Sequence, residues 1–120
     1  MSLSLYLQAR ILSLVANGSY ASLHIGDPGR TGADEIAGVS YRRQVVEFGQ
    51  PADGSIRNAS PLTFEGMPAR TIRYIGLFDA ALAGNFLWGV ELLSARTTAE
   101  GDTFRIRAGD LTFSLGEEVS

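Results

Sequence analysis

The chain has 120 residues, of which 45% are hydrophobic, and its 13 acidic and 10 basic side chains give a net charge of −3. A chain of this size forms one domain with a single core, and its acidic balance argues against nucleic acid or an anionic membrane as a partner. Cysteine is absent, which excludes a disulfide framework and any cysteine-based metal site or nucleophile.

All of the basic residues are arginine, and lysine is absent. A GC-rich genome explains this bias without any functional meaning. Alternatively, the forked guanidinium groups bridge carboxylates or carbonyls at protein interfaces, where arginine is favoured over lysine.

The N-terminal segment, residues 1–18, has two interpretations. Residues 3, 5, 7, 9 and 11 are apolar and alternate with polar ones, as in a half-buried strand. Its many helix formers, an N-cap at Ser2 or Ser4 and an exit at Asn17-Gly18 favour a helix instead. We predict a helix over 4–16. Because apolar residues cover much of its circumference, we expect it to pack on the domain or on a neighbouring subunit.

Downstream, β-branched and aromatic runs alternate with turns of Gly, Asp and Asn. These runs predict strands over 19–26, 41–48, 55–59, 70–78, 86–93, 103–107 and 111–115, with Pro61 to Phe64 following the third strand and a possible bulge at Gly89. About seven short strands in one flat sheet would leave an apolar face exposed. We therefore predict an all-β domain over 19–116, an antiparallel β-sandwich or flattened barrel with one short N-terminal helix, and a tail over 117–120.

The sequence offers little for catalysis. His24 is the only histidine, and the nearest acid in sequence, Asp27, lies in the following turn. A general base needs a nucleophile or an orienting carboxylate nearby, so a partly exposed or locally hydrogen-bonded histidine is the simpler interpretation. Phosphate-binding and nucleophile motifs are absent from the sequence. We predict that the protein is not an enzyme, with no catalytic residue and no cofactor.

Several acids precede or follow glycine in predicted turns. Asp27, Asp102 and Asp110 match no calcium-binding pattern, so we interpret them as turn residues and predict no metal site. Asp79 ends the best predicted strand, where it resembles a cap closing the hairpin to Phe86. The left-handed residues of that hairpin are expected at Gly84-Asn85.

The candidate interface combines apolar and basic side chains. Some of the arginines could form a basic stripe, but the acidic overall balance favours an acidic protein neighbour or internal pairing with Glu47, Glu65 and Glu91 over nucleic acid. The arginines of that stripe are Arg42, Arg43, Arg57, Arg70 and Arg73. The predicted interface residues are Leu7, Ile11, Leu14, Tyr41, Arg42, Arg43 and Trp88.

The order and spacing of six segments resemble a family of small bacteriophage virion proteins of the mycobacteriophage type, usually described as tail fibre or minor tail proteins. The segments are Leu-His-Ile-Gly-Asp-Pro-Gly-Arg-Thr-Gly (23–32), Tyr-Arg-Arg-Gln-Val-Val-Glu-Phe-Gly (41–49), Leu-Thr-Phe (62–64), Ile-Gly-Leu-Phe-Asp-Ala (75–80), Gly-Asn-Phe-Leu-Trp (84–88) and Gly-Asp-Thr-Phe-Arg-Ile-Arg-Ala-Gly-Asp-Leu (101–111). The resemblance implies a short helix before the first strand and no catalytic residues.

We therefore expect a virion structural protein of the tail fibre or minor tail type, assembled in the host cytoplasm. It would act by docking onto other virion proteins, in the tail or the capsid, and would form a homo-oligomer without nucleic acid or membrane partners. One alternative is a head decoration or spike protein that clamps capsid subunits. Another is a host-carbohydrate-binding tip, for which Trp88, Tyr41 and Tyr74 are the candidate aromatic platform.

Overall fold

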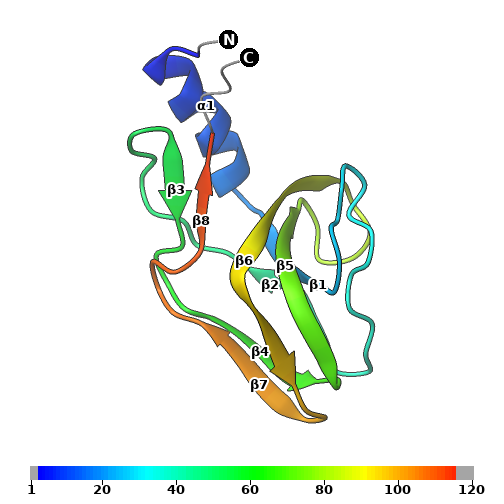
Figure 1. The fold of residues 1–120 in the computed structure, drawn as a ribbon. Coiled ribbons are helices and arrows are strands. Elements are labelled where there is room, and N and C mark those ends of the chain that lie inside the picture. Colours follow the sequence, from blue (N-terminus) through cyan, green and yellow to red (C-terminus); the bar gives the residue numbers. More distant parts are fainter. Residues whose placement is uncertain (1–2, 116–120) are drawn as a thin grey trace.

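The computed structural model describes residues 3–115 as an elongated molecule, 45 Å along its longest axis, with one helix at one end (Figure 1). The predicted tail over 117–120 lies outside the described residues. The elements are α1 (Leu5–Ala16), β1 (Tyr20–His24), β2 (Gln44–Val45), β3 (Ser55–Arg57), β4 (Leu62–Met67), β5 (Arg70–Phe78), β6 (Phe86–Thr98), β7 (Asp102–Ile106) and β8 (Thr112–Ser114).

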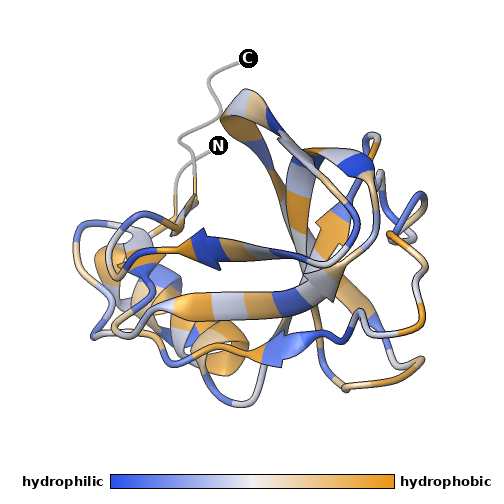
Figure 2. Ribbon diagram, turned by 90° about the horizontal axis from the view of Figure 1, so that it is seen from below, coloured by the Kyte–Doolittle hydropathy of each residue, from blue (hydrophilic) through white to orange (hydrophobic). Residues whose placement is uncertain are grey.

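The strands form three antiparallel sheets. Four strands pair in the order β2-β1-β5-β6, and two further sheets pair β3 with β8 and β4 with β7. The predicted all-β sandwich is thus confirmed, whereas the sheets described for residues 3–115 do not close into a barrel. Apolar and polar residues alternate along the strands (Figure 2), as expected for sheets that each bury one face.

The core lies between the sheets and reaches the helix. Phe64 and Phe113, each 1% exposed, come from the two small sheets, while Leu23 and Leu77 of the four-stranded sheet are fully buried. Leu12 joins this core from α1. One apolar cluster therefore joins all of the sheets to the helix. Each large side chain in it contributes about 1.5–3 kcal/mol when it is fully buried.

The helix begins and ends where capping residues predict. The Ser4 hydroxyl accepts a hydrogen bond from the Leu7 amide at 3.1 Å, which satisfies one of the free donors of the first turn. The helix ends at Ala16, before Asn17, and Gly18 follows with a φ of 92°. This confirms the helix over the strand interpretation.

The structure corrects the strand prediction at three places. The strand expected over 41–48 shrinks to the two residues of β2, because Tyr41 turns into the core. No separate strand was assigned after Pro61, yet β4 forms there and buries Leu62, Phe64 and Met67. The strand expected to end at residue 93 continues as β6 to Thr98.

The longest strand, β6, is irregular at places other than Gly89. Gly89 pairs regularly with Gly76, so the bulge predicted there is wrong; a Cβ at Gly89 would lie 2.8 Å from Pro28 Cγ, which explains the glycine. The register instead shifts between Leu77 and Phe78, and again where Ile72 pairs with Arg96 but Tyr74 pairs with Glu91. Residues 92–95 of β6 therefore oppose a single residue of β5.

Candidate docking surface

An apolar stripe runs along the solvent side of α1. Leu7 is 43% exposed and Leu14 is 78% exposed, and Ile11 between them is partly exposed. Spacings of four and three residues place the three side chains on one helix face. The buried residues Gln8 and Leu12 each follow a stripe residue by one position, so they lie on the adjoining face of the helix. The helix is thus anchored to the domain through one face and carries an exposed leucine-rich stripe on the face beside it.

Trp88 does not stand free beside this stripe. Its ring is half-buried, and its centroid lies 5.2 Å from that of Phe113, against the core cluster. Tyr41 is only 9% exposed and stacks on Phe64. Of the aromatic platform considered from the sequence, Tyr74 is also only partly exposed. Tyr41 and Trp88 therefore contribute packing within the chain, and their part in an interface stays a prediction.

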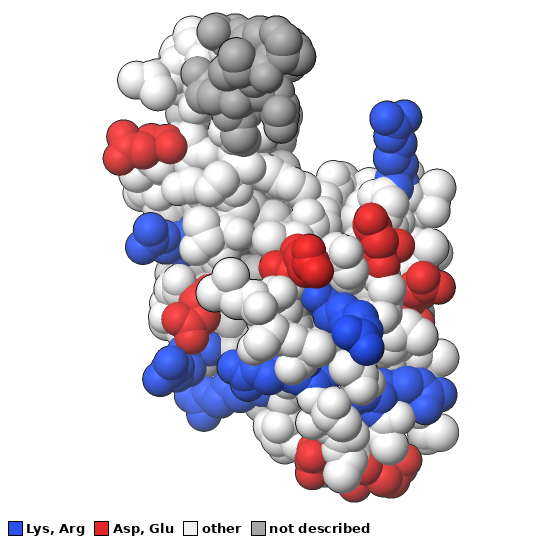
Figure 3. All heavy atoms as spheres, in the orientation of Figure 1, with Lys and Arg blue, Asp and Glu red and all other residues white. Residues whose placement is uncertain are grey.

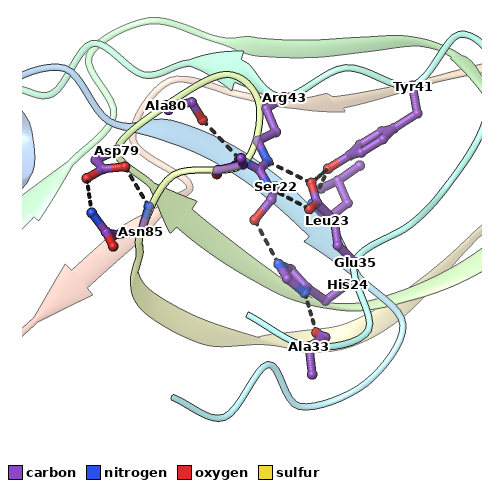
Figure 4. A network of polar contacts seen from close by, with 11 residues as sticks. Ser22, Leu23, His24, Ala33, Glu35, Tyr41, Arg43, Asp79, Ala80 and Asn85 are labelled. Atoms are coloured by element: carbon purple, nitrogen blue, oxygen red, sulfur yellow. Dashed lines mark hydrogen bonds and ion pairs between the residues drawn. The ribbon is translucent and has the colours of Figure 1, made fainter. Parts of the chain in front are cut away.

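Tyr41 and Arg43 belong to a polar network with Glu35 (Figure 4). Arg43 donates to both carboxylate oxygens of Glu35, at 2.8 and 2.9 Å, and the Tyr41 hydroxyl donates to the same carboxylate at 2.8 Å. Burial opposes ionisation of Glu35, but these hydrogen bonds outweigh it and lower its pKa. Burial raises the pKa of Tyr41, and the ion pair raises that of Arg43. The network is a charged, paired and stable structural unit.

The same arginine joins two loops. Arg43 also donates to the carbonyl oxygens of Ala80 and Ala83, at 3.0 and 2.8 Å, in the connection between β5 and β6. Arg42, by contrast, is exposed and bonds only to nearby carbonyls, those of Val39 and Tyr41. Of the predicted pair, Arg43 is therefore structural and Arg42 is available to a neighbour.

One of the two alternatives for the arginines, internal pairing with Glu47, Glu65 and Glu91, is not found among residues 3–115. Within residues 3–115 the ion pairs are Arg43–Glu35 and Arg107–Asp110, so Glu47, Glu65 and Glu91 pair with no arginine there. The Asp27 carboxylate accepts from the Gly29 amide and that of Asp102 from the Ala99 amide, both at 2.8 Å, which confirms their turn roles.

His24 sits in an arrangement that resembles a nucleophile–base pair. Ser22 Oγ lies 2.7 Å from His24 Nε2, and Nδ1 lies 2.8 Å from the Ala33 carbonyl oxygen (Figure 4). Because a carbonyl only accepts, Nδ1 carries the proton and Nε2 accepts from the serine. Sequence reasoning missed Ser22, although two residues apart on a strand always share a face.

That pair has no path to a substrate. Both Ser22 and His24 are fully buried, and a carbonyl rather than a carboxylate orients the ring. The His24 ring lies against the rings of Phe78 and Phe86. Gly76 on β5 leaves room for it, because a Cβ there would lie 2.7 Å from His24 Nε2. Burial lowers the pKa of His24. The arrangement is a buried, satisfied hydrogen-bond pair.

The described part of the chain contains neither a metal-binding cluster nor a membrane-spanning helix. Across residues 3–115 no group of three or more His, Asp or Glu side chains gathers in a way that could hold a metal ion. In the same range no helix has the length and apolar character needed to cross a bilayer. The open apolar stripe of α1 is thus the clearest candidate for a functional surface.

A comparison with protein families gives the fibre-type assignment independent support. The family described as podophage GP4 fiber I protein gp80 matches residues 3–114. The chain belongs to this family. The matched residues contain the helix and all eight strands, so the match to the gp80 fibre family extends over α1 as well as the sandwich.

Membership makes the protein a phage virion structural protein of the fibre type. The expected phage structural class is confirmed, and this class is typically without catalytic activity. No curated protein matches the gp80-family chain in a sequence search.

Proposed function

We propose that the protein is a subunit of a phage tail, where α1 docks it onto another virion protein. The proposal rests on one observation, the apolar stripe of Leu7, Ile11 and Leu14 on a helix at the end of the molecule. A leucine that is 78% exposed gains roughly 1.5–3 kcal/mol on complete burial. A helix face with several such residues is suited to a helical groove or to another helix in the particle.

The stripe has the geometry of a helix–helix seam. Leu7, Ile11 and Leu14 follow the four-then-three spacing of the inner positions of a coiled coil. Arg10 and Tyr6 flank it, and the Arg10 guanidinium carbon lies 5.7 Å from the centre of the Tyr6 ring. Aromatic and arginine side chains are the residues that interfaces favour at such positions.

The alternative roles receive less support. A carbohydrate-binding tip would need exposed aromatic rings side by side, but Tyr41 is buried and Trp88 packs on Phe113. No observation favours a capsid position over a tail position. The narrower likeness to mycobacteriophage-type proteins also stays a prediction.

The test is the double substitution Leu7→Asp and Leu14→Asp in the phage gene. Both positions are exposed, so we expect the folded domain to keep its thermal stability while the subunit disappears from purified particles. Deleting α1 is a poorer test, because it would also remove the fully buried Leu12 from the core.

The matched control places the same two charges on another exposed face of α1, as Ala9→Asp and Ser13→Asp. This variant should enter particles at the wild-type level. If the Leu7/Leu14 variant is incorporated as well as this control, the stripe does not dock the subunit and the proposal is wrong.

A further inference from the structure

A groove of about 510 Å³ opens between β6 and β7, away from the helix. Figure 1 shows the two strands diverging from the short connection that joins them. The groove has an apolar floor made of residues from the large sheet, from β7 and from the turn before β8. These are Ile75, Val90, Leu92, Phe104, Ile106 and Leu111.

Both strands that border the groove are edge strands. Within residues 3–115, β6 pairs only with β5, and β7 pairs only with β4. The edge of such a strand presents unpaired amide and carbonyl groups, which can pair with another chain unless they are blocked. The edge of β6 is the longest in the protein, since the strand runs from Phe86 to Thr98.

A single apolar side chain stands on the rim of this groove. Leu93 is fully exposed, and it lies in the stretch 92–95 that opposes a single residue of β5. The same surface patch therefore contains a projecting apolar side chain and an apolar groove that could receive one. Such a patch complements a second copy of itself.

The charged residues at the rim of the groove also fit a second copy of the chain. Glu91 and Asp110 contribute negative charge, and Arg96 and Arg105 contribute positive charge. Figure 3 shows acidic and basic side chains interspersed on one face of the molecule. A patch with both signs in equal number does not select a strongly charged partner, but it is complementary to itself when a two-fold axis turns one copy onto the other.

We propose that a second copy of this chain binds at the β6–β7 groove about a two-fold axis. Leu93 of each copy enters the groove of the other, and Glu91 of each copy lies against Arg96 of the other. A two-fold contact is reciprocal, so each of these pairs forms twice. This dimer does not use the α1 stripe, so it stands independently of the docking function proposed above.

Sedimentation velocity of the purified full chain over a range of concentrations tests the dimer. We expect a concentration-dependent dimer in the wild type and an increase of about tenfold or more in the dissociation constant with Leu93→Asp, as for a central interface residue. Val39→Asp is the matched control, because Val39 is 95% exposed and lies outside the groove. It should dimerise like the wild type, as should the Leu7/Leu14 variant.

A charge exchange tests the two-fold geometry. Glu91→Arg alone and Arg96→Glu alone should each weaken the dimer, because each places like charges together twice. Mixing these two variants should restore dimerisation, since the mixed dimer contains two opposite-charge contacts. A wild-type monomer at every concentration, a trimer, a dimer insensitive to Leu93→Asp, or mixing without recovery would each overturn the proposal.

Discussion

The Arg43 guanidinium lies over the ring of Phe78, with its central carbon 3.6 Å from the ring centroid, while the same group binds both oxygens of Glu35. A planar cation can stack on an aromatic ring and donate in its plane at the same time. This double contact fixes the chain after Ser40 against the end of β5. It explains why the strand-like residues 41–43 stay outside the sheet, which the chain joins at Gln44.

Replacing Arg43 by lysine should therefore destabilise the protein. An ammonium group keeps the charge but loses the two-point contact with Glu35, the stacking on Phe78 and at least one loop carbonyl contact. We expect a loss of about 1–2 kcal/mol in the free energy of unfolding, measured by denaturant titration at pH 7. Arg57→Lys, at an exposed position on β3, should change it by less than about 0.5 kcal/mol. Equal effects at both positions would contradict this role for Arg43.

The burial of His24 predicts a weakening of the fold in mild acid. Burial lowers the pKa of His24 below the value of 6.5 expected in the unfolded chain, despite nearby Glu35 and Asp34. As the pH falls through 6.5, the unfolded chain binds a proton that the folded protein does not. The free energy of unfolding then decreases by up to about 1.4 kcal/mol per pH unit, until the pH reaches the folded pKa.

The comparison of wild type with His24→Gln between pH 7.5 and 5.5 measures this effect. The variant is expected to be less stable at pH 7.5, because it disturbs the bonds to Ser22 and Ala33, yet its stability should not change with pH over this window. The pKa of Glu35 is lowered from 4.5, so its titration falls below the window. A wild type with no dependence on pH there would contradict the prediction.

The sequence predicts regular elements well where one local pattern decides. The strand expected over 70–78 is β5 as observed, and the helix over 4–16 differs from α1 by one residue, because Ser4 is its cap. Prediction from the sequence fails where contacts between distant residues decide the local structure. Pro61 and Gly66 weaken the strand signal of β4, but pairing with β7 imposes it, and Gly66 adopts a φ of 62° at the register shift.

The candidate site divides in the same way. The spacing of Leu7, Ile11 and Leu14 predicts their shared helix face, and α1 places them as expected. Tyr41 could not be assigned from its neighbours, because its burial depends on Leu23 and Glu35, 18 and six residues away. An aromatic residue beside two arginines has the same sequence pattern whether it faces a partner or the core.

The loop after β5 contains a strained alanine. Asp79 closes this loop as predicted, since its carboxylate accepts hydrogen bonds from the backbone amide of Asn85 at 2.7 Å and from the side-chain amide of Asn85 at 2.9 Å. The hydrogen bond from the backbone amide is the main cause that lowers the pKa of Asp79. The left-handed residues, however, are Ala83 at φ 54° and Gly84 at φ 75°, rather than Gly84 and Asn85. A side chain in this region costs energy that glycine avoids.

Ala83→Gly should therefore stabilise the protein by about 0.5–1 kcal/mol. Gly84→Ala should destabilise it by about 1–3 kcal/mol, because its φ is unfavourable and a Cβ would lie 2.5 Å from the Asp79 carboxylate oxygen. Thermal denaturation should show a higher melting temperature for Ala83→Gly and a lower one for Gly84→Ala than for the wild type. Ala81→Gly, in the same exposed loop without a left-handed φ, is the control for added flexibility and should be neutral or slightly destabilising.

Asn58 uses its whole side chain to hold the turn between β7 and β8. Its oxygen accepts from the amides of Gly109 and Leu111, at 3.1 and 2.9 Å, and its nitrogen donates to the carbonyls of Ser60 and Arg107, at 2.9 and 3.0 Å. The residue is only 2% exposed. In sequence it resembles a surface glycosylation signal, and nothing local indicates the four distant or buried contacts.

Asn58→Asp tests this network with the smallest possible change in shape. A carboxylate cannot donate, so the carbonyls of Ser60 and Arg107 lose their bonds, and the remaining choice is a buried charge or a proton taken up at neutral pH. We expect a loss of about 2–4 kcal/mol at pH 7, by chemical denaturation. Part of it should return near pH 5, because protonation supplies one donor again. Gln50→Glu, the same exchange at an exposed position, should change stability by less than about 0.5 kcal/mol; if Asn58→Asp is equally mild, the amide does not hold the turn.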